Sequence, residues 1–235
     1  GRETVARVMA GAVAQMVVRA ISPDTRVVGF STQIGPILLS ESEHAKVIQK
    51  LAESDLDVDS FAARFPNSKK AVEIEEMLLN AKLDGKSFGG MAQVMVFGSP
   101  RYLGQPVFHK LKADLASAYL GIGATSSVEL GDGLDVIDKE GSEFHRKAKA
   151  AAYGGIRGGI STGEDLIFRV SFKPTSSVLD VAKKGRHDPC IVPRAIPVME
   201  AMTWIVLADH LLWQRTDQIK SITPTGGDGQ QSLFD

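Results

Sequence analysis

The chain has 235 residues, of which 43% are hydrophobic and 23% are charged, and its formal net charge at pH 7 is -1. This composition is too apolar for a disordered chain and is typical of a globular protein with a substantial core. A near-zero charge balance argues against nucleic acid as the main partner, because nucleic-acid-binding proteins usually carry a basic excess. A near-zero net charge is still compatible with a local basic pocket for a small anion.

One cysteine, Cys190, excludes an internal disulfide framework and favours a reducing, cytoplasmic compartment. We find no run of about 18 uncharged apolar residues, so we expect no membrane partner. The first residues also lack the layout of a signal peptide. The chain opens on Gly1-Arg2-Glu3-Thr4 without a methionine, and we therefore expect the sequence to be a piece of a longer protein.

Hydrophobic periodicity predicts the elements in chain order. The first half is expected to contain a helix over 3–20, a strand over 26–34, helices over 42–53 and 69–83, and a strand over 87–98. The second half is expected to contain a helix over 106–120, short strands around 126–130 and 165–172, and a long helix near 195–214. Alternation of strands and helices with glycine-rich turns predicts a mixed α/β or α+β fold. We expect one domain over 1–222 and a disordered polar tail over 223–235.

Three of the predicted helices have an apolar face that we expect to be used in packing. In the helix over 3–20 it contains Val5, Val8, Met9, Ala12, Val13 and Met16. In the helix over 106–120, which has Pro106 in its first turn, it contains Phe108, Leu111, Leu115, Ala118 and Tyr119. In the long helix it contains Val198, Ala201, Met202, Ile205, Ala208 and Leu212.

A glycine-rich segment over 154–161, GGIRGGIS, is the first candidate for chemistry. Paired glycines let the backbone approach a ligand closely and present N–H groups to an anion or a flat ring. A glycine-rich hairpin with bulges explains the same residues equally well. The segment has neither the GxGxxG layout of a dinucleotide fold nor the Gly-Lys-Ser/Thr ending of a P-loop.

A second candidate is the segment over 173–177, KPTSS, which directly follows a predicted strand. One ammonium, three hydroxyls and a stiffened turn suit a ligand that carries a phosphate. A capping turn without a ligand is the commoner explanation for an isolated cluster of this kind.

The third candidate is the loop over 185–194, GRHDPCIVPR. Arg186 and Arg194 can clamp carboxylates, and His187 or Asp188 can move a proton. A metal site is disfavoured because adjacent residues do not converge easily on one tetrahedral ion. Cys190 is followed by apolar residues, which favours a buried structural thiol over a nucleophile.

Six segments occur in the order found in chorismate synthases, which this sequence resembles from Gly1 to about Leu212. They are GRETVARVMAGAVA at 1–14, YLGQPVFHKLKADLA at 102–116, VELGDG at 128–133, GGIRGGISTGE at 154–164, FKPTSS at 172–177 and GRHDPCIVPRAIPVMEAMTWIVLADHLL at 185–212. The last segment is the most specific, since we know of no other family with GRHDPC-x-VPRA ahead of such a helix.

The resemblance implies an enzyme that converts 5-enolpyruvylshikimate 3-phosphate into chorismate, the last step of the shikimate pathway. The reaction is a 1,4-anti elimination of phosphate and a C6 proton that needs reduced FMN without net redox change. Reduced flavin supplies electron density as phosphate leaves, and the flavin N5 takes the proton with help from the aspartate that matches Asp188. The protein supplies orientation and electrostatics. NADP is linked to the family through a flavin reductase activity, and the sequence leaves open whether this member has it.

The family also implies a fold, an assembly and a set of site residues. Its fold is a β-α-β sandwich of the α+β class, with helices packed between antiparallel sheets, and it assembles as a homotetramer. Residue by residue, the FMN contacts fall on Gly123, Ala124, Gly158, Lys173, Pro174, Thr175, Ser176, Ser177 and Arg186. Arg2 and Arg186 match substrate-binding arginines, and Asp188 matches the catalytic aspartate. We expect no metal.

The sequence departs from the family pattern in several places. It lacks counterparts of the two catalytic histidines and of several substrate-binding arginines. None of its histidines replaces them by motif: His44, His109, His145, His187 and His210. Lys86 stands in place of the aspartate of GDSxGG, Gln105 in place of the glutamate of GLGEPVF, and Tyr153 where alanine is usual; the stretches 144–153 and 178–184 are short. We therefore expect the 235-residue chain alone to form no chorismate.

Two other classes of function stay open at this point. The chain can be a flavin- or phosphate-binding or oligomerisation module of the same fold without turnover, which the missing histidines favour for the isolated chain. An unrelated nucleotide-binding protein is disfavoured by the absence of P-loop and dinucleotide fingerprints.

Overall fold

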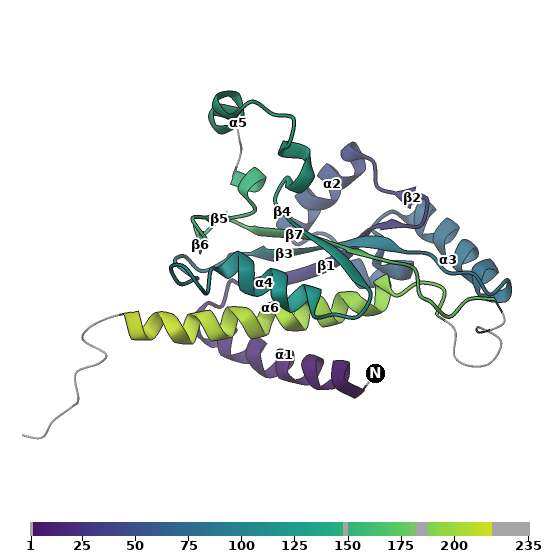
Figure 1. Ribbon diagram of the computed structural model, residues 1–235, viewed down its shortest axis with the longest axis horizontal. Coiled ribbons are helices and arrows are strands. Elements are labelled where there is room, and N and C mark those ends of the chain that lie inside the picture. The colour runs from purple at the N-terminus through teal and green to yellow at the C-terminus, as the bar shows by residue number, and fades with distance from the viewer. Residues whose placement is uncertain (1, 148–149, 180, 182–187, 218–235) are drawn as a thin grey trace, which may run out of the picture.

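A computed structural model describes residues 2–147, 150–179, 181 and 188–217. The predicted α+β class is confirmed, since helices lie on both faces of an antiparallel sheet (Figure 1). The tail over 223–235 lies outside the described residues, so its predicted disorder stays a prediction.

The α-helices are α1 (Arg2–Ile21), α2 (Glu41–Ala52), α3 (Ser68–Leu83), α4 (Leu111–Leu120), α5 (Gly141–Lys147) and α6 (Val192–Gln214). The strands are β1 (Arg26–Ile34), β2 (Ile37–Leu38), β3 (Gly90–Phe97), β4 (Thr125–Leu130), β5 (Ile156–Arg157), β6 (Ile160–Ser161) and β7 (Leu166–Phe172). Short 3-10 turns lie between α2 and α3 (Val58–Ser60 and Ala62–Arg64) and after β4 (Gly133–Val136).

The main sheet has the strand order β2-β1-β3-β7-β4, and all its neighbouring strands are antiparallel. Strand β7 shows the alternation of a strand with two different faces. Its even-numbered residues, from Leu166 to Phe172, are buried, and Phe168 contacts Tyr119 of α4. Arg169 points to the other face, where α2 lies. Strands β5 and β6 form a separate hairpin.

The helices form layers on the two faces of this sheet (Figure 1). Helices α4 and α6 cover one face, and α1 packs on the outer side of α6. Because α6 lies between the sheet and α1, it is buried nearly all round rather than along one stripe. Val198, Ala201 and Ala208 of the predicted apolar face are buried, as expected. Leu212, at the end of the helix, is 51% exposed.

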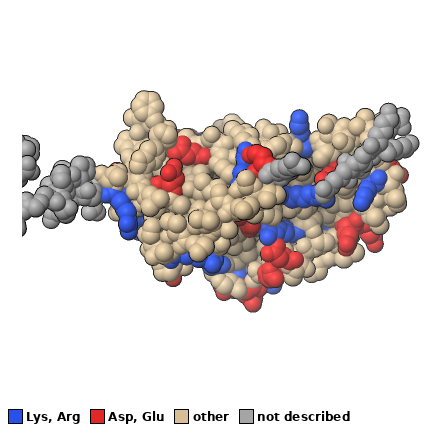
Figure 2. All heavy atoms as spheres, turned by 90° about the horizontal axis from the view of Figure 1, so that it is seen from below, with Lys and Arg blue, Asp and Glu red and all other residues tan. Residues whose placement is uncertain are grey.

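Helix α1 has the predicted position but packs through small residues. Gly11, Ala14 and Val18 are buried, and a Cβ atom on Gly11 would lie 2.5 Å from the Cβ of Ala201. The predicted apolar face points away from α6: Val5 is 59% exposed and Met9 66%. Charged side chains are sparse over much of the surface on this side of the molecule (Figure 2).

Two helical segments, Glu3–Ile21 and Val192–Asp217, are long and apolar enough to cross a membrane by length and composition alone. The second belongs to the core. Core helices of water-soluble proteins pass the same test, so these two segments are weak evidence for a membrane.

The predicted helix over 106–120 begins later, at Leu111. Residues 105–109 form a turn in which the Gln105 amide donates to the His109 carbonyl at 2.7 Å. Val107 has φ 69°, which a right-handed helix excludes, and Phe108 is 84% exposed. The prediction that Pro106 occupies the first turn is therefore wrong.

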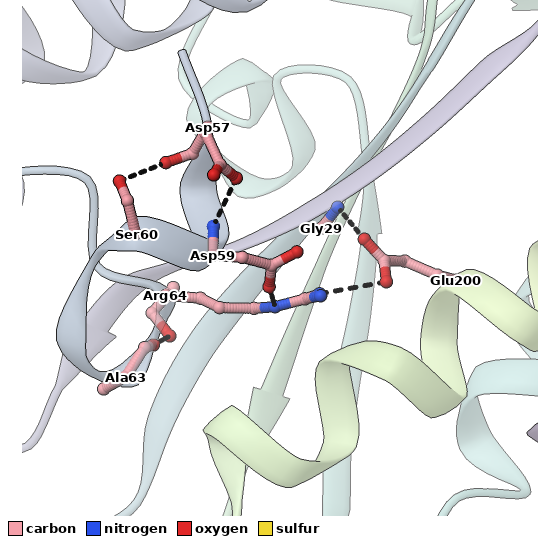
Figure 3. A network of polar contacts seen from close by, with 8 residues as sticks. Gly29, Asp57, Asp59, Ser60, Ala63, Arg64 and Glu200 are labelled. Atoms are coloured by element: carbon pink, nitrogen blue, oxygen red, sulfur yellow. Dashed lines mark hydrogen bonds and ion pairs between the residues drawn. The ribbon is translucent and has the colours of Figure 1, made fainter.

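A partly buried ion pair holds α6 against the edge of the sheet (Figure 3). One carboxylate oxygen of Glu200 accepts the Gly29 amide at 2.7 Å, on the edge of β1 that the short β2 leaves uncovered. The other oxygen lies 2.9 Å from Arg64 Nη1, and the Arg64 Nε lies 2.6 Å from Asp59. Burial raises the pKa of the Glu200 carboxyl above its usual 4.5, although Arg64 opposes the shift.

We expect Glu200→Gln to change the pH dependence of stability. Between the unfolded pKa of 4.5 and the raised folded pKa, the folded state holds more protons than the unfolded state. The contribution of Glu200 to stability is therefore largest below this window and falls as pH rises through it. Urea unfolding at several pH values should show the variant gaining stability relative to the wild type as pH rises. A difference that stays constant from about pH 4 to 7 would contradict this assignment.

Candidate active site

The turn over 173–177 lies at the end of β7, next to the loop that precedes β4. The Lys173 amide donates to the Ala124 carbonyl at 3.0 Å, so two of the segments expected to contact FMN are adjacent. Ala124 has φ 70°, and the space that a Cβ on Gly123 would occupy has no atom within 4 Å. The backbone at Gly123 is therefore open to a ligand.

The same turn is joined to the loop before α6. The Thr175 hydroxyl donates to the Asp188 carbonyl at 2.7 Å. Ser87 donates its hydroxyl to the Thr175 carbonyl at 2.8 Å, and the Phe88 amide donates to the Pro189 carbonyl at 2.7 Å. Sequence reasoning did not place Ser87 in the site, although it lies in the SFGG segment that resembles the family's GDSxGG.

Asp188 is held by an ion pair with a residue of α6. Its Oδ2 lies 2.8 Å from Arg194 Nη1, and the Asp188 side chain is 24% exposed. Helix α6 has Ile191 at its N-cap and no side-chain cap, so Asp188 does not cap it. Arg194, one of the two arginines expected to clamp carboxylates, instead holds this carboxylate in place. Arg186 and His187 lie outside the described residues.

Several polar side chains of the turn have no partner among the described residues. Lys173 and Ser176 are exposed, Ser177 is half-buried, and their side chains have no hydrogen-bond or ion-pair partner within the described ranges. One free ammonium and two free hydroxyls beside an open backbone fit a phosphate group. Pro174 fixes the backbone between them.

Cys190 is 5% exposed, and burial raises the pKa of its thiol. A buried thiol of this kind is not a nucleophile, which agrees with the structural role expected from the sequence. Among the residues described, no group of three or more His, Cys, Asp or Glu side chains is arranged to hold a metal ion.

Arg2 and Gly158, the other two described residues expected in the site, lie at opposite ends of the molecule, and Arg2 lies at the end that holds the turn over 173–177 (Figure 1). Arg2 begins α1, whose first turns lie at the same end of the molecule as the start of α6 (Figure 1), but its side chain is not described. Arg7 approaches Gly121, two residues before Gly123. Gly158 lies in the β5–β6 hairpin at the opposite end (Figure 1).

Strand β7, which has seven residues, lies between the hairpin and the turn. The hairpin adjoins the start of β7, because Gly155 packs against the backbone of Asp165. A seven-residue strand spans about 23 Å, so the two segments do not meet within one chain.

The fold and the candidate site define an α+β protein in which the turn over 173–177, with its unpartnered lysine and serines, lies beside an ion-paired aspartate. Comparison with known proteins gives its family. The family model described as chorismate synthase matches residues 1–212, and the chain belongs to the chorismate synthase family.

Similar proteins agree with this assignment. A chorismate synthase of Bdellovibrio bacteriovorus is 58% identical over 219 residues, which are 93% of this chain and 62% of that protein. A chorismate synthase of Phocaeicola vulgatus is 35% identical over 240 residues, covering 93% of this chain and 64% of that protein. A crystal structure of chorismate synthase superposes with a TM-score of 0.75 at 28% identity and covers 91% of this chain and 64% of that one. The chain thus spans less than two thirds of the relatives that it matches.

Proposed function

We propose that this chain forms the larger part of a chorismate synthase, a lyase that eliminates phosphate from 5-enolpyruvylshikimate 3-phosphate in the shikimate pathway. The observation that carries the proposal is the joining of the Lys173–Ser177 turn to the Asp188 loop through the Thr175 hydroxyl. This contact joins a turn with a free ammonium and free hydroxyls to the loop that carries the Asp188 carboxylate, and an elimination of phosphate and a proton needs groups of both kinds.

The residues present fit a flavin mononucleotide. Lys173, Ser176 and Ser177 would hold its phosphate, and the open backbone at Gly123 and Ala124 allows a flat ring to approach closely. When bound in reduced form, the flavin supplies the electron density that the elimination requires. The chain supplies the orientation of that group and of the substrate.

Asp188 is the residue that we assign to proton transfer. Arg194 fixes its carboxylate through one oxygen, which leaves the other oxygen available to a proton acceptor or donor at the site. Arg2 and Arg186 are proposed to bind the anionic substrate, as their positions in the family motifs imply.

A flavin titration tests the phosphate-binding turn. In a full-length protein that carries this sequence, Lys173→Ala with Ser176→Ala should weaken FMN binding about tenfold or more, because a charge-assisted contact and a hydroxyl contact are lost. The binding constant is followed by flavin absorbance in the presence of substrate. The matched control is Lys112→Ala with Ser117→Ala on the exposed side of α4, which should leave it unchanged. Equal affinities of both variants and the wild type would remove the turn from the site.

Gly158 enters the proposal through a homotetramer. Because Gly158 and Lys173 lie at opposite ends of β7, the glycine would contact the flavin bound by a neighbouring copy. Two variants test this, each assayed at an FMN concentration too low to support its activity alone: Gly158→Asp and Lys173→Ala with Ser176→Ala. Mixed tetramers should regain activity, since some interfaces combine two intact segments, whereas sites contained within one chain would give none.

A flavin- or phosphate-binding module without turnover is the alternative for the 235 residues alone. The free groups of the Lys173–Ser177 turn suit both functions. An anaerobic assay with reduced FMN separates them, because only the enzyme releases phosphate. A reducing, cytoplasmic location is proposed on the single buried cysteine.

A further inference from the structure

We propose that a pocket between α2 and the first turn of α3 binds a small amphipathic anion, a ring or short apolar chain that carries a carboxylate or a phosphate. The pocket has a volume of about 360 Å³, within the range of small-ligand sites. It lies far from the candidate active site: α3 has 16 residues, so about 24 Å separate its first turn from its end, where Gly85 bonds to Leu179.

Three lysines at the pocket lack carboxylate partners within the described part of the chain. Lys46 and Lys50 lie one helical turn apart on α2, and Lys69 lies in the first turn of α3. All three side chains are exposed, and none has an ion pair with a described residue.

Glu43, the acidic residue among those that line the pocket, is already neutralised. Its carboxylate lies 2.5 Å from Lys70 Nζ and accepts hydrogen bonds from the Ser40 amide and the Asn67 side chain. Lys70 and Ser40 lower the pKa of Glu43 to about 2. The pocket therefore keeps an excess of positive charge.

The start of α3 adds backbone donors to these charges. Asn67 caps the helix by accepting from the Lys70 amide, but the amides of Ser68 and Lys69 have no partner in the described structure. Free amides at a helix start attract anions, and here Ser68 and Lys69 line the same pocket as Lys46 and Lys50.

The inner wall of the pocket is apolar. It contains buried Val47 and Pro66 together with partly exposed Leu56 and Phe61. Inorganic phosphate would leave this surface in contact with water, whereas a ring attached to the anion would cover it. The apolar wall and the positive charge of the lysines together favour an amphipathic anion over an inorganic one.

The experiment uses the 235-residue chain labelled with ¹⁵N and titrated with 4-fluorophenyl phosphate, 4-fluorobenzoate, inorganic phosphate and 4-fluorobenzyl alcohol. At least one of the two aromatic anions should bind saturably and shift the Ser68 and Lys69 amides; the tighter of the two identifies the preferred anionic group. Inorganic phosphate and the neutral alcohol should bind more weakly than the better of the two aromatic anions. Changing Lys46, Lys50 and Lys69 to Gln should weaken binding about tenfold, and Lys82→Gln at the exposed far end of α3 should not.

The proposal is overturned by any of the following results. The first is that neither aromatic anion saturates below about 10 mM. The second is that inorganic phosphate binds as tightly as the better aromatic anion. The third is that binding shifts only the Lys173–Ser177 amides, or falls equally in the Lys82→Gln variant.

Discussion

Asp188→Asn should lower kcat of the full-length enzyme about 10²- to 10⁴-fold while substrate and flavin bind nearly as before. The amide keeps the size of the side chain and can still accept from Arg194, but it has lost the basicity that proton transfer needs. Single-turnover kinetics with reduced FMN under anaerobic conditions measure the chemical step, and equilibrium titrations measure binding. Lost substrate binding with normal turnover of the bound fraction would show that the aspartate acts in binding instead.

Arg194→Gln is the matched control for this result. If Asp188 serves only to fasten the loop to α6, both substitutions break the same ion pair and should have similar effects on melting temperature and on kcat. If Asp188 transfers a proton, Arg194→Gln leaves the carboxylate in place. Its kcat should then fall far less than that of Asp188→Asn.

Local sequence signals were enough to place most elements. The strand over 26–34 was predicted with the bounds it has, because a run of β-branched residues follows a proline-containing turn. The start of α4 was not predicted correctly, because it depends on a contact between residues distant in sequence. The Leu111 amide donates to the Gly159 carbonyl. No pattern within 106–120 reveals that partner.

In the candidate site, too, the local motifs could be predicted from the sequence and the contacts between them could not. The sequence identified the turn over 173–177 and the loop over 185–194 separately, since each carries its own chemistry. Their joining through Thr175 and the pairing of Asp188 with Arg194 are tertiary contacts that no spacing rule predicts. The distance between Gly158 and Lys173 likewise follows from how β7 is placed, not from the motifs at its two ends.

Hydrophobic periodicity predicted the wrong contact face for α1. The periodicity identifies the large apolar residues, yet the helix contacts α6 through its small residues, because close approach of two helices needs a surface without long side chains. The large residues, among them Met9 and Met16, are left exposed.

Gly11→Leu should therefore be the most destabilising single change on α1, even though it adds an apolar side chain to an apolar helix. The first added carbon would lie 2.5 Å from the Cβ and 2.6 Å from the Cα of Ala201, so α1 must move away from α6. Overpacking of this kind costs about 3 kcal/mol, which lowers the melting temperature of a chain of this size by about 6–12 °C. Ala10→Leu, one position along on the exposed side, controls for helix propensity and added hydrophobic surface. Thermal unfolding followed by circular dichroism should show a loss for Gly11→Leu alone; equal melting temperatures would mean that α1 is held to the protein by something other than its contact with α6.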